Sequence, residues 1–255
     1  PAAASQDADF RDLLRGLKSI RPGIHLKCFT AVEIAFFAET YGMTDEAVLR
    51  ALMAAGLDSL PGGGAEIFAE RVRRKICHDK ADADRYLSIH RIAHGLGMRS
   101  NVTMLYGHIE TMEERVDHML RARALQDETG GFQAFIPLAF HPDHNQMRKL
   151  PAPSASDTLR VHAVARLMLD NIPHVKAFWI ATGIEVAQMA LWYGADDLDG
   201  TVQEEKIYHM AGSRTPETLG TADIRRLIRA AGRLPVERDT LYNVITPPEA
   251  DEVPA

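Results

Sequence analysis

Apolar residues along this chain alternate between two spacings, the three-to-four-residue period of a helix face and the short continuous run of a buried strand. Helical spacing predicts helices over residues 10–20, 31–39, 45–55, 86–96, 111–127, 157–170, 183–193 and 217–231. Short apolar runs predict strands near residues 24–29, 57–60, 101–106, 132–139, 175–180 and 197–201. Strands that alternate with helices in this way favour a parallel sheet with right-handed crossovers.

This alternation identifies a fold class. A closed TIM barrel has eight strands, whereas about six are predicted here, and the first predicted element is a helix with no strand before it. We therefore predict an α/β fold, a partial (β/α) TIM-type barrel with about six parallel strands, outer helices and the first two strands missing. Residues 1–245 would form this single domain, and residues 246–255 would be a disordered acidic tail. The chain begins at Pro1 without Met, which we interpret as an N-terminally truncated sequence.

Composition narrows the functional classes. The chain has 255 residues, 46% of them hydrophobic, and a formal net charge of -6, which allows one large core and argues against nucleic-acid binding. No apolar run reaches the roughly 20 residues that span a bilayer, and no signal peptide is visible, so we expect a cytoplasmic protein without membrane contact. The two cysteines, Cys28 and Cys77, lack metal-ligand spacing, and incidental free thiols are the favoured interpretation.

Polar residues gather at the end of the predicted strand near 101–106. In parallel α/β folds, chemistry takes place where strands end and the loops to helices begin. Gly107 stops this strand, and an amphipathic helix opens at about Thr111. The polar side chains of the stretch are Asn101, Thr103, Tyr106, His108 and Glu110. A plain strand-to-helix turn is the alternative, but the other predicted strand ends are also polar, which favours a binding site.

A triple glycine follows the predicted strand near 57–60. Residues 61–66 read Pro-Gly-Gly-Gly-Ala-Glu. Backbone N–H groups of such a run can approach a ligand closely, and a following helix start favours an anion such as a carboxylate or a phosphate. The Lys-Ser/Thr ending of a P-loop is missing. A flexible turn is the alternative, and the direct connection to a strand favours ligand binding.

Charged residues mark three further strand ends. His141 follows the strand over 132–139, where it could act at the mouth of the barrel. Lys176 lies among strand-core residues and therefore needs an acidic partner on a neighbouring strand. The carboxylates near the last strand, Asp196, Asp197 and Asp199, could hold ribose hydroxyls or pair with Lys176.

A histidine pair offers an alternative site. His90 and His94 lie at i and i+4 on one face of a predicted helix, which is a conceivable metal pair. No third ligand lies nearby in the sequence. We therefore favour the interpretation that they are exposed or half-buried histidines on an outer helix.

Six stretches carry a resemblance to a known family. They are residues 25–34, 56–68, 100–111, 126–142, 194–201 and 231–240. From about Phe10 to Tyr242, the chain resembles the C-terminal two-thirds of aminofutalosine synthase, a radical S-adenosylmethionine (SAM) enzyme of the futalosine route to menaquinone. Two sister families, cyclic dehypoxanthine futalosine synthase and the deazaflavin-forming synthase, share the pattern more loosely.

The resemblance implies a radical SAM transferase that uses a [4Fe-4S] cluster. The 5′-deoxyadenosyl group of SAM would add to 3-[(1-carboxyvinyl)oxy]benzoate, and loss of CO2 would give aminofutalosine. SAM would bind at Tyr106, Gly107 and Glu110. The substrate would bind at Ser59, Gly62, Gly63, Gly64, Glu66, Asn101, His108, His141, Lys176, Asp197 and Arg238. No residue of this chain is assigned a catalytic or metal-binding role.

This chain departs from the family pattern in two respects, because the cluster-binding loop and the second strand with its Gly-Gly SAM-binding end are both missing. The cysteine triad C-x3-C-x2-C that holds the cluster is not present, and Cys28 and Cys77 cannot replace three thiolates. We therefore expect the chain alone to be inactive. Three interpretations stay open: a truncated gene product, a subunit completed by a separate N-terminal chain, and a non-catalytic module that keeps part of the substrate pocket.

Overall fold

The computed structural model of the protein describes residues 2–246, with side chains described for residues 10–245. Its helices are α1 (Ala2–Ile20), α2 (Ala31–Tyr41), α3 (Asp45–Ala55), α4 (Glu70–Ile76), α5 (Ala83–Gly95), α6 (Met112–Thr129), α7 (Ala155–Met168), α8 (Trp179–Thr182), α9 (Ile184–Ala190), α10 (Ile207–Met210) and α11 (Thr221–Ala230). Its strands are β1 (Ser59–Leu60), β2 (Arg99–Tyr106), β3 (Phe132–Ala139), β4 (His174–Val175), β5 (Glu237–Arg238) and β6 (Val244–Thr246).

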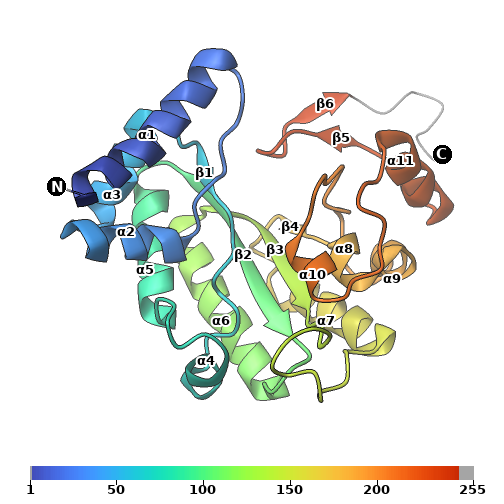
Figure 1. Ribbon diagram of the computed structural model, residues 1–255. Helices are drawn as coiled ribbons and strands as arrows, with labels where there is room; N and C mark the ends of the chain where they lie inside the picture. Colours follow the sequence, from blue (N-terminus) through green and yellow to red (C-terminus); the bar gives the residue numbers. More distant parts are fainter. Residues whose placement is uncertain (1, 247–255) are drawn as a thin grey trace.

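A parallel sheet occupies the centre of the molecule (Figure 1). Its order β1-β2-β3-β4 follows the sequence, and helices connect the successive strands. The long central pair, β2 and β3, is in register from Val102 opposite Phe135 to Tyr106 opposite Ala139, so the two carboxyl ends lie level. Parallel strands joined through helices confirm the predicted α/β class.

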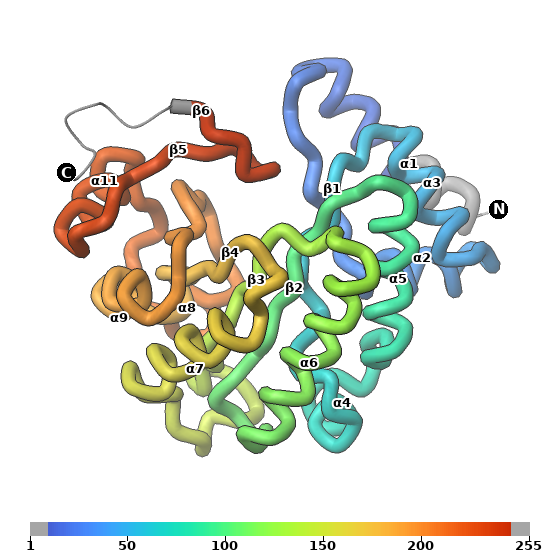
Figure 2. Tube along the Cα trace, turned by 180° about the vertical axis from the view of Figure 1, so that it is seen from behind, coloured from blue at the N-terminus to red at the C-terminus, as the bar shows by residue number. Residues whose placement is uncertain are grey.

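The two faces of the sheet have different surroundings. Helices α5 and α6 pack on β2 and α7 packs on β3, so these helices lie in front of the sheet when it is seen from behind (Figure 2). Val102 and Met104 are fully buried, and Tyr106 in the same alternation contacts Thr158 of α7. The alternate residues of β2, such as Thr103, therefore face the opposite, inner side of the sheet.

Segments from the C-terminal third approach the inner side of the sheet. The short helix α10 lies in front of the sheet in Figure 1. The antiparallel hairpin β5–β6 lies near the end of the sheet opposite to the arrowhead of β2. This arrangement separates the inner side into a carboxyl-terminal region at the strand ends and a second region next to the hairpin.

Two of the predicted strands, over residues 24–29 and 197–201, are not regular strands in the structure, so these two predictions are wrong. Residues 24–29 are extended, and Leu26 O accepts a hydrogen bond from Asp58 N (2.9 Å), but the Leu26 N–H donates to the Asp58 side chain instead of to a backbone carbonyl. At the other edge, a single parallel bridge joins Lys176 to Asp197, and Asp199 has φ +68°, so no regular strand continues over 197–201. The described sheet therefore has four parallel strands rather than about six.

The predicted strand over 175–180 changes into a helix. β4 ends at Val175, and Phe178 O accepts hydrogen bonds from Ala181 N and Thr182 N at the start of α8. Trp179 is 1% exposed, and its indole Nε1 donates to Gly200 O over 3.2 Å. A short apolar run fits a buried strand and a buried helix equally well, which explains the error.

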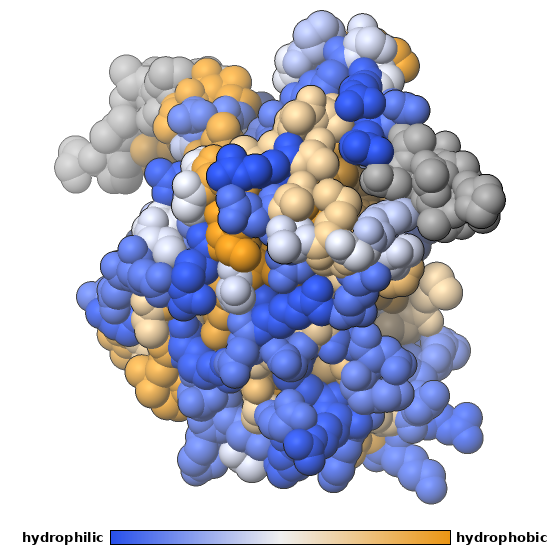
Figure 3. Space-filling view, turned by 90° about the vertical axis from the view of Figure 1, so that its left-hand side faces the viewer, coloured by the Kyte–Doolittle hydropathy of each residue, from blue (hydrophilic) through white to orange (hydrophobic). Residues whose placement is uncertain are grey.

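The C-terminal end and the surface of the molecule complete the fold. Thr246 ends β6, and residues 247–255, the rest of the predicted disordered tail, lie outside the described residues. Among residues 2–246, no helix is long and apolar enough to cross a bilayer. Figure 3 shows one face that is mainly hydrophilic in its lower half, with apolar surface in its upper half and along its lower left edge.

Candidate functional site

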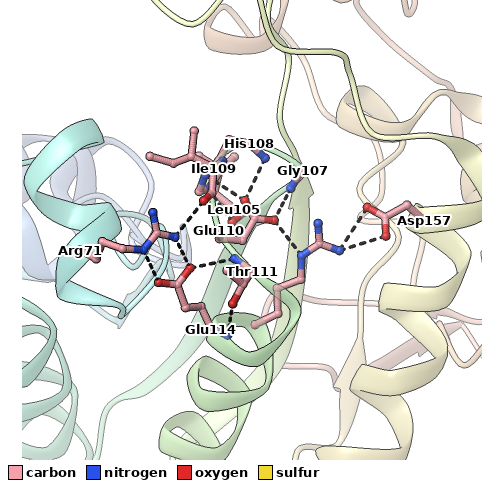
Figure 4. Close-up of polar contacts among 10 residues, drawn as sticks. Arg71, Leu105, Gly107, His108, Ile109, Glu110, Thr111, Glu114 and Asp157 are labelled. Carbon is pink, nitrogen blue, oxygen red and sulfur yellow. Dashed lines mark hydrogen bonds and ion pairs between the residues drawn. The ribbon is translucent and has the colours of Figure 1, made fainter.

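A polar loop at the end of β2 is held by its own side chains (Figure 4). The Glu110 carboxylate accepts hydrogen bonds from Gly107 N (2.6 Å) and from His108 N (2.9 Å). Gly107 has φ +90°, a conformation that side-chain-bearing residues rarely adopt, so glycine is needed for this turn. Thr111 then caps α6 through a reciprocal capping box. The loop therefore has one defined conformation before any ligand binds.

Glu110 is an ionised carboxylate in a buried position, with its side chain 0% exposed. Burial raises its pKa, but the hydrogen bonds from His108 and Gly107 and the charge of Arg115 outweigh burial and lower the pKa to about 2. Arg115 Nε lies 2.7 Å from Oε1, and His108 Nδ1 lies 2.9 Å from Oε2. Both oxygens are thus occupied by the protein, so in the predicted SAM site Glu110 would act by shaping the loop.

Arg115 is a residue that sequence analysis missed. It is 7% exposed, and its Nη1 donates to both oxygens of Asp157 on α7, over 3.0 and 3.1 Å. Its guanidinium carbon also lies 5.4 Å from the centre of the Tyr106 ring. Arg115 therefore joins the β2 loop to two helices, and nothing in the local sequence indicates this, because Asp157 is 42 positions away.

The glycine-rich segment lies along β2 rather than forming an open loop. Gly62 O accepts hydrogen bonds from the Thr103 hydroxyl and from the buried Tyr86 hydroxyl, both over 2.7 Å. Further on, Glu66 O accepts from Leu105 N over 2.7 Å. The backbone of this predicted anion-binding segment is therefore fixed by contacts with β2, and Glu66 itself pairs with Lys80 at 2.5 Å.

Gly64→Ala is expected to lower the free energy of unfolding by about 2 kcal/mol, because a non-glycine residue is strained in the left-handed region. Gly64 has φ +87°, and a β-carbon there would lie 2.3 Å from a methyl group of Val32. Gly23→Ala is the matched control, since a β-carbon at Gly23 would have no other atom within 4 Å. Urea unfolding of both variants measures the difference, and equal stability would contradict the assigned conformation.

A charged cluster lies on the inner side of the sheet. Lys176 forms an ion pair with Asp199, so the predicted acidic partner is present, although Asp199 lies in a loop and not on a neighbouring strand. Asp197 Oδ2 accepts from Arg238 Nη2 (2.6 Å) and Nε (3.0 Å). Burial raises the pKa of Asp197, but the charges of Lys176 and Arg238 lower it more, so the net direction is downward. Two cations and two carboxylates therefore pair within this cluster.

Tyr242, between the two strands of the hairpin, packs its aromatic ring against this cluster. The rings of Tyr242 and His174 stack with centroids 3.9 Å apart and an interplanar angle of 7°, and the Arg238 guanidinium lies 4.4 Å from the Tyr242 ring centre. A cavity of about 940 Å³ opens beside it, lined by residues of the 194–202 segment, α11 and the 233–244 segment. Tyr242 is a second residue that the sequence pattern did not single out.

The structure divides the predicted site residues into two regions. Tyr106, Gly107, His108 and Glu110 lie at the carboxyl end of β2, and His141 follows β3 with its Nε2 2.7 Å from Ala181 O. The inner cluster includes Arg238 of β5, so it lies beside the hairpin. Ser59, whose hydroxyl lies 2.7 Å from His25 Nε2, and the buried Asn101 lie toward the amino-terminal ends of β1 and β2, away from the loop that follows Tyr106.

His90 is a core residue that is 0% exposed, so the interpretation of an exposed or half-buried outer-helix histidine is wrong for it, whereas His94 is half-buried, as predicted. His90 Nδ1 and His94 Nε2 both lie within hydrogen-bond distance of the Ser100 hydroxyl, at 2.9 and 2.7 Å. No group of three His, Cys, Asp or Glu side chains suited to a metal ion occurs among the described residues. The pair therefore supports packing of α5 on β2.

The residues of this chain do not fit a [4Fe-4S] cluster. Such a cluster needs cysteine thiolates gathered around it. Cys28 is exposed on the extended segment before α2, whereas Cys77 is buried at the end of α4, and burial raises the pKa of both thiols. Ligands for a cluster are therefore not supplied by the part of the chain that the structure describes.

Two sequence families match the chain, one after the other. The radical SAM superfamily matches residues 5–122, and the family described as "CofH/MqnC C-terminal region" matches residues 129–251. In three dimensions, the fold is similar to that of methylornithine synthase (PylB), with a TM-score of 0.53 and 16% sequence identity over 78% of this chain and 60% of that one. At this identity the likeness concerns the fold alone.

Curated relatives define the family more closely. The chain is 54% identical over 242 residues to aminodeoxyfutalosine synthase of Thermus thermophilus and 46% identical over 243 residues to that of Streptomyces coelicolor. It is 38% identical to a 5-amino-6-(D-ribitylamino)uracil–L-tyrosine 4-hydroxyphenyl transferase of Archaeoglobus fulgidus, of which it covers 71%. The match spans 93% of this chain but only 65% of the Thermus relative's length. The chain belongs to the radical SAM family that contains the aminodeoxyfutalosine synthases.

Proposed function

We propose that this chain forms part of an aminodeoxyfutalosine synthase, a transferase that joins the 5′-deoxyadenosyl group of SAM to 3-[(1-carboxyvinyl)oxy]benzoate in menaquinone biosynthesis. The observation that carries the proposal is the 54% identity to the Thermus aminodeoxyfutalosine synthase, against 42% to the Methanopyrus kandleri 4-hydroxyphenyl transferase. In this proposal, the four parallel strands and their flanking extended segments are part of a (β/α) TIM-type barrel, as the sequence pattern predicts.

The geometry of the inner side supports a carboxylate-bearing substrate. The substrate has two carboxylates, and cationic side chains with apolar or aromatic neighbours are suitable partners for them. Lys176 and Arg238 are buried or half-buried beside the Tyr242 ring, and their own aspartates keep them in fixed positions. Their role in the proposal is to bind and orient the substrate, while SAM, when bound, supplies the adenosyl group.

The β2 loop is the proposed contact for SAM. Gly107 places the loop backbone near the carboxyl ends of β2 and β3, where ligands of parallel α/β folds bind. Glu110 and Arg115 hold that backbone in place. The remaining predicted residues, among them Gly62, Gly63, Gly64 and His141, stay predicted substrate contacts.

Cyclic dehypoxanthine futalosine synthase is the second candidate function. The observation that favours it is the match of residues 129–251 to the family described as "CofH/MqnC C-terminal region". The deazaflavin-forming reaction and a non-catalytic substrate-binding module also stay alternatives. These four functions differ in the compounds that the protein would bind or convert.

The test is product analysis with a chimera. Because the chain spans 65% of the Thermus relative, the part of that relative outside the match is joined to this chain and the cluster is reconstituted anaerobically. We expect aminofutalosine from SAM and 3-[(1-carboxyvinyl)oxy]benzoate, detected by mass spectrometry. Parallel reactions contain 5-amino-6-(D-ribitylamino)uracil with L-tyrosine, or dehypoxanthine futalosine. Turnover of either of these instead, or of none, would contradict the proposed function.

A further inference from the structure

Lys27 lies on the edge of the sheet with its side chain on the inner side. The extended segment 24–29 runs beside β1, where the backbone oxygen of Leu26 accepts from Asp58 N. Leu26 is 4% exposed in the main core, and alternate residues of an extended segment face opposite sides. His25, two positions before Lys27, contacts the buried Ser59 hydroxyl. Lys27 therefore points away from the core that holds Leu26.

The charges that Lys27 experiences come from across the inner side. Lys176 and Arg238 repel its ammonium group, Asp199 attracts it, and Lys27 in turn acts on His25. Lys176 directly follows β4, Arg238 lies in β5 and Asp199 lies in the 194–202 segment, so the side chain of Lys27 faces the charged cluster. The cluster then contains three cations and, with Asp197, two carboxylates.

Lys27 is the cation without a carboxylate partner. Lys176 pairs with Asp199 and Arg238 pairs with Asp197, whereas Lys27 has no hydrogen bond or ion pair among residues 2–246. A half-buried ammonium group is costly unless an anion accompanies it. The inner cluster thus has an excess positive charge at the position of Lys27, which an incoming anion would neutralise.

We propose that Lys27 binds a carboxylate of the substrate, and that Lys176 and Arg238, fixed by their aspartates, complete an aromatic-carboxylate subsite. The inference rests on the proposed function, because it deepens the choice of a carboxylate-bearing substrate. A second observation supports a ligand on this face: Asn101 is 4% exposed, yet its side-chain oxygen has no hydrogen-bond partner among the described residues. A buried acceptor of this kind is normally satisfied by a protein group, water or ligand.

The electrostatics give the subsite a pH dependence. Burial, followed by repulsion from Lys176 and Arg238, lowers the pKa of Lys27 to about 8. A bound carboxylate favours the charged ammonium form, so binding strengthens below about pH 8 and weakens above it as the free lysine loses its proton. A lysine with a purely structural role would not produce this dependence.

The experiment measures binding of isophthalate (benzene-1,3-dicarboxylate) to the 255-residue chain by titration calorimetry. Wild-type protein should bind isophthalate about tenfold more weakly at pH 9.5 than at pH 7. Lys27→Met should reduce affinity at pH 7 by at least about tenfold, whereas Lys27→Arg should stay within about threefold and lose the pH dependence. Lys75→Met is the matched control, because Lys75 is an exposed lysine on α4, and its affinity should equal that of wild type.

A second measurement needs no variant. Acetylation of wild-type protein, followed site by site with mass spectrometry, should give Lys27 a labelling midpoint near pH 8 and protection by isophthalate, with neither effect at Lys75. Absence of isophthalate binding, equal affinity of Lys27→Met, or unprotected Lys27 would each overturn the inference. Failure of the chimera to form aminofutalosine, with Lys27-dependent binding intact, would overturn the proposed function and leave the carboxylate subsite standing.

Discussion

Replacement of Arg115 by methionine is expected to lower the free energy of unfolding by about 3–5 kcal/mol, the usual cost of breaking a buried ion pair by removing one partner. Methionine keeps much of the side-chain volume, but the Glu110 carboxylate, 0% exposed, loses the Arg115 Nε at 2.7 Å. Asp157 loses both hydrogen bonds from Nη1. For a chain of this size, such a loss lowers the melting temperature by roughly 10 °C.

Arg71→Met is the matched control for this variant. Arg71 contacts the same loop, since its Nη2 donates to Ile109 O (2.9 Å) and pairs with Glu114 (2.6 Å), but its side chain is 48% exposed. An exposed pair contributes about 0–1 kcal/mol, so the two variants should differ by several-fold in their effect. Calorimetric melts and urea unfolding at pH 7 measure both. Comparable losses for the two variants would show that burial of Glu110 does not control the stability of the loop.

The long elements of the fold follow from the sequence, and the short ones do not. The helix predicted over 45–55 matches α3, because Thr44 accepts from Ala47 N and Gly56 ends the helix with φ +114°. The strand predicted over 132–139 matches β3 as well. The predicted strand over 24–29 is wrong because the Leu26 N–H bonds to the Asp58 side chain, and the one over 197–201 is wrong because only a single bridge forms there. The alternation of apolar residues along the sequence does not show which hydrogen bonds the backbone makes.

The candidate site could be predicted only in part, because local sequence patterns do not reveal contacts between residues far apart in the chain. Strand-end polarity pointed to Glu110 and Lys176, because local patterns mark where strands stop, whereas Arg238 was predicted only from the family resemblance. It did not identify Arg115 or Lys27. Arg115 acts through a partner 42 positions away, and the lack of a partner for Lys27 becomes visible only when the side chains around it are located.

Acidification from pH 7 to pH 5 is expected to lower the free energy of unfolding by about 6 kcal/mol through three histidines, the buried His90 and His118 and the half-buried His94. Burial lowers the pKa of His90 to about 3, of His94 to about 4 and of His118 to about 3. Each is neutral in the folded chain at pH 5, whereas the unfolded chain binds a proton below its ordinary value of 6.5. Their stabilisation is therefore complete above pH 6.5 and lost as the pH falls, by about 2 kcal/mol each at pH 5.

The proton uptake provides the decisive measurement. At pH 5, unfolding should bind nearly three protons at these sites, so the unfolding free energy should change by about 4 kcal/mol per pH unit. Since a net stability of roughly 5–15 kcal/mol is typical, unfolding in mild acid is the expected outcome. Glu110, with its pKa of about 2, keeps its contribution over this range and does not obscure the slope.

Urea unfolding between pH 5 and pH 8 measures this slope. His118→Gln, which removes a titrating ring whose Nε2 donates to Thr103 O, should reduce the slope by about one proton. His78→Gln is the control, because the His78 side chain is 70% exposed and its removal should leave the slope unchanged. A slope below one proton in the wild-type chain would mean that the buried imidazoles accept protons in the folded state. In that case, charged imidazolium groups would be present in the core between α5, α6 and β2. That result would contradict the complete burial of His90 and His118, which are 0% exposed.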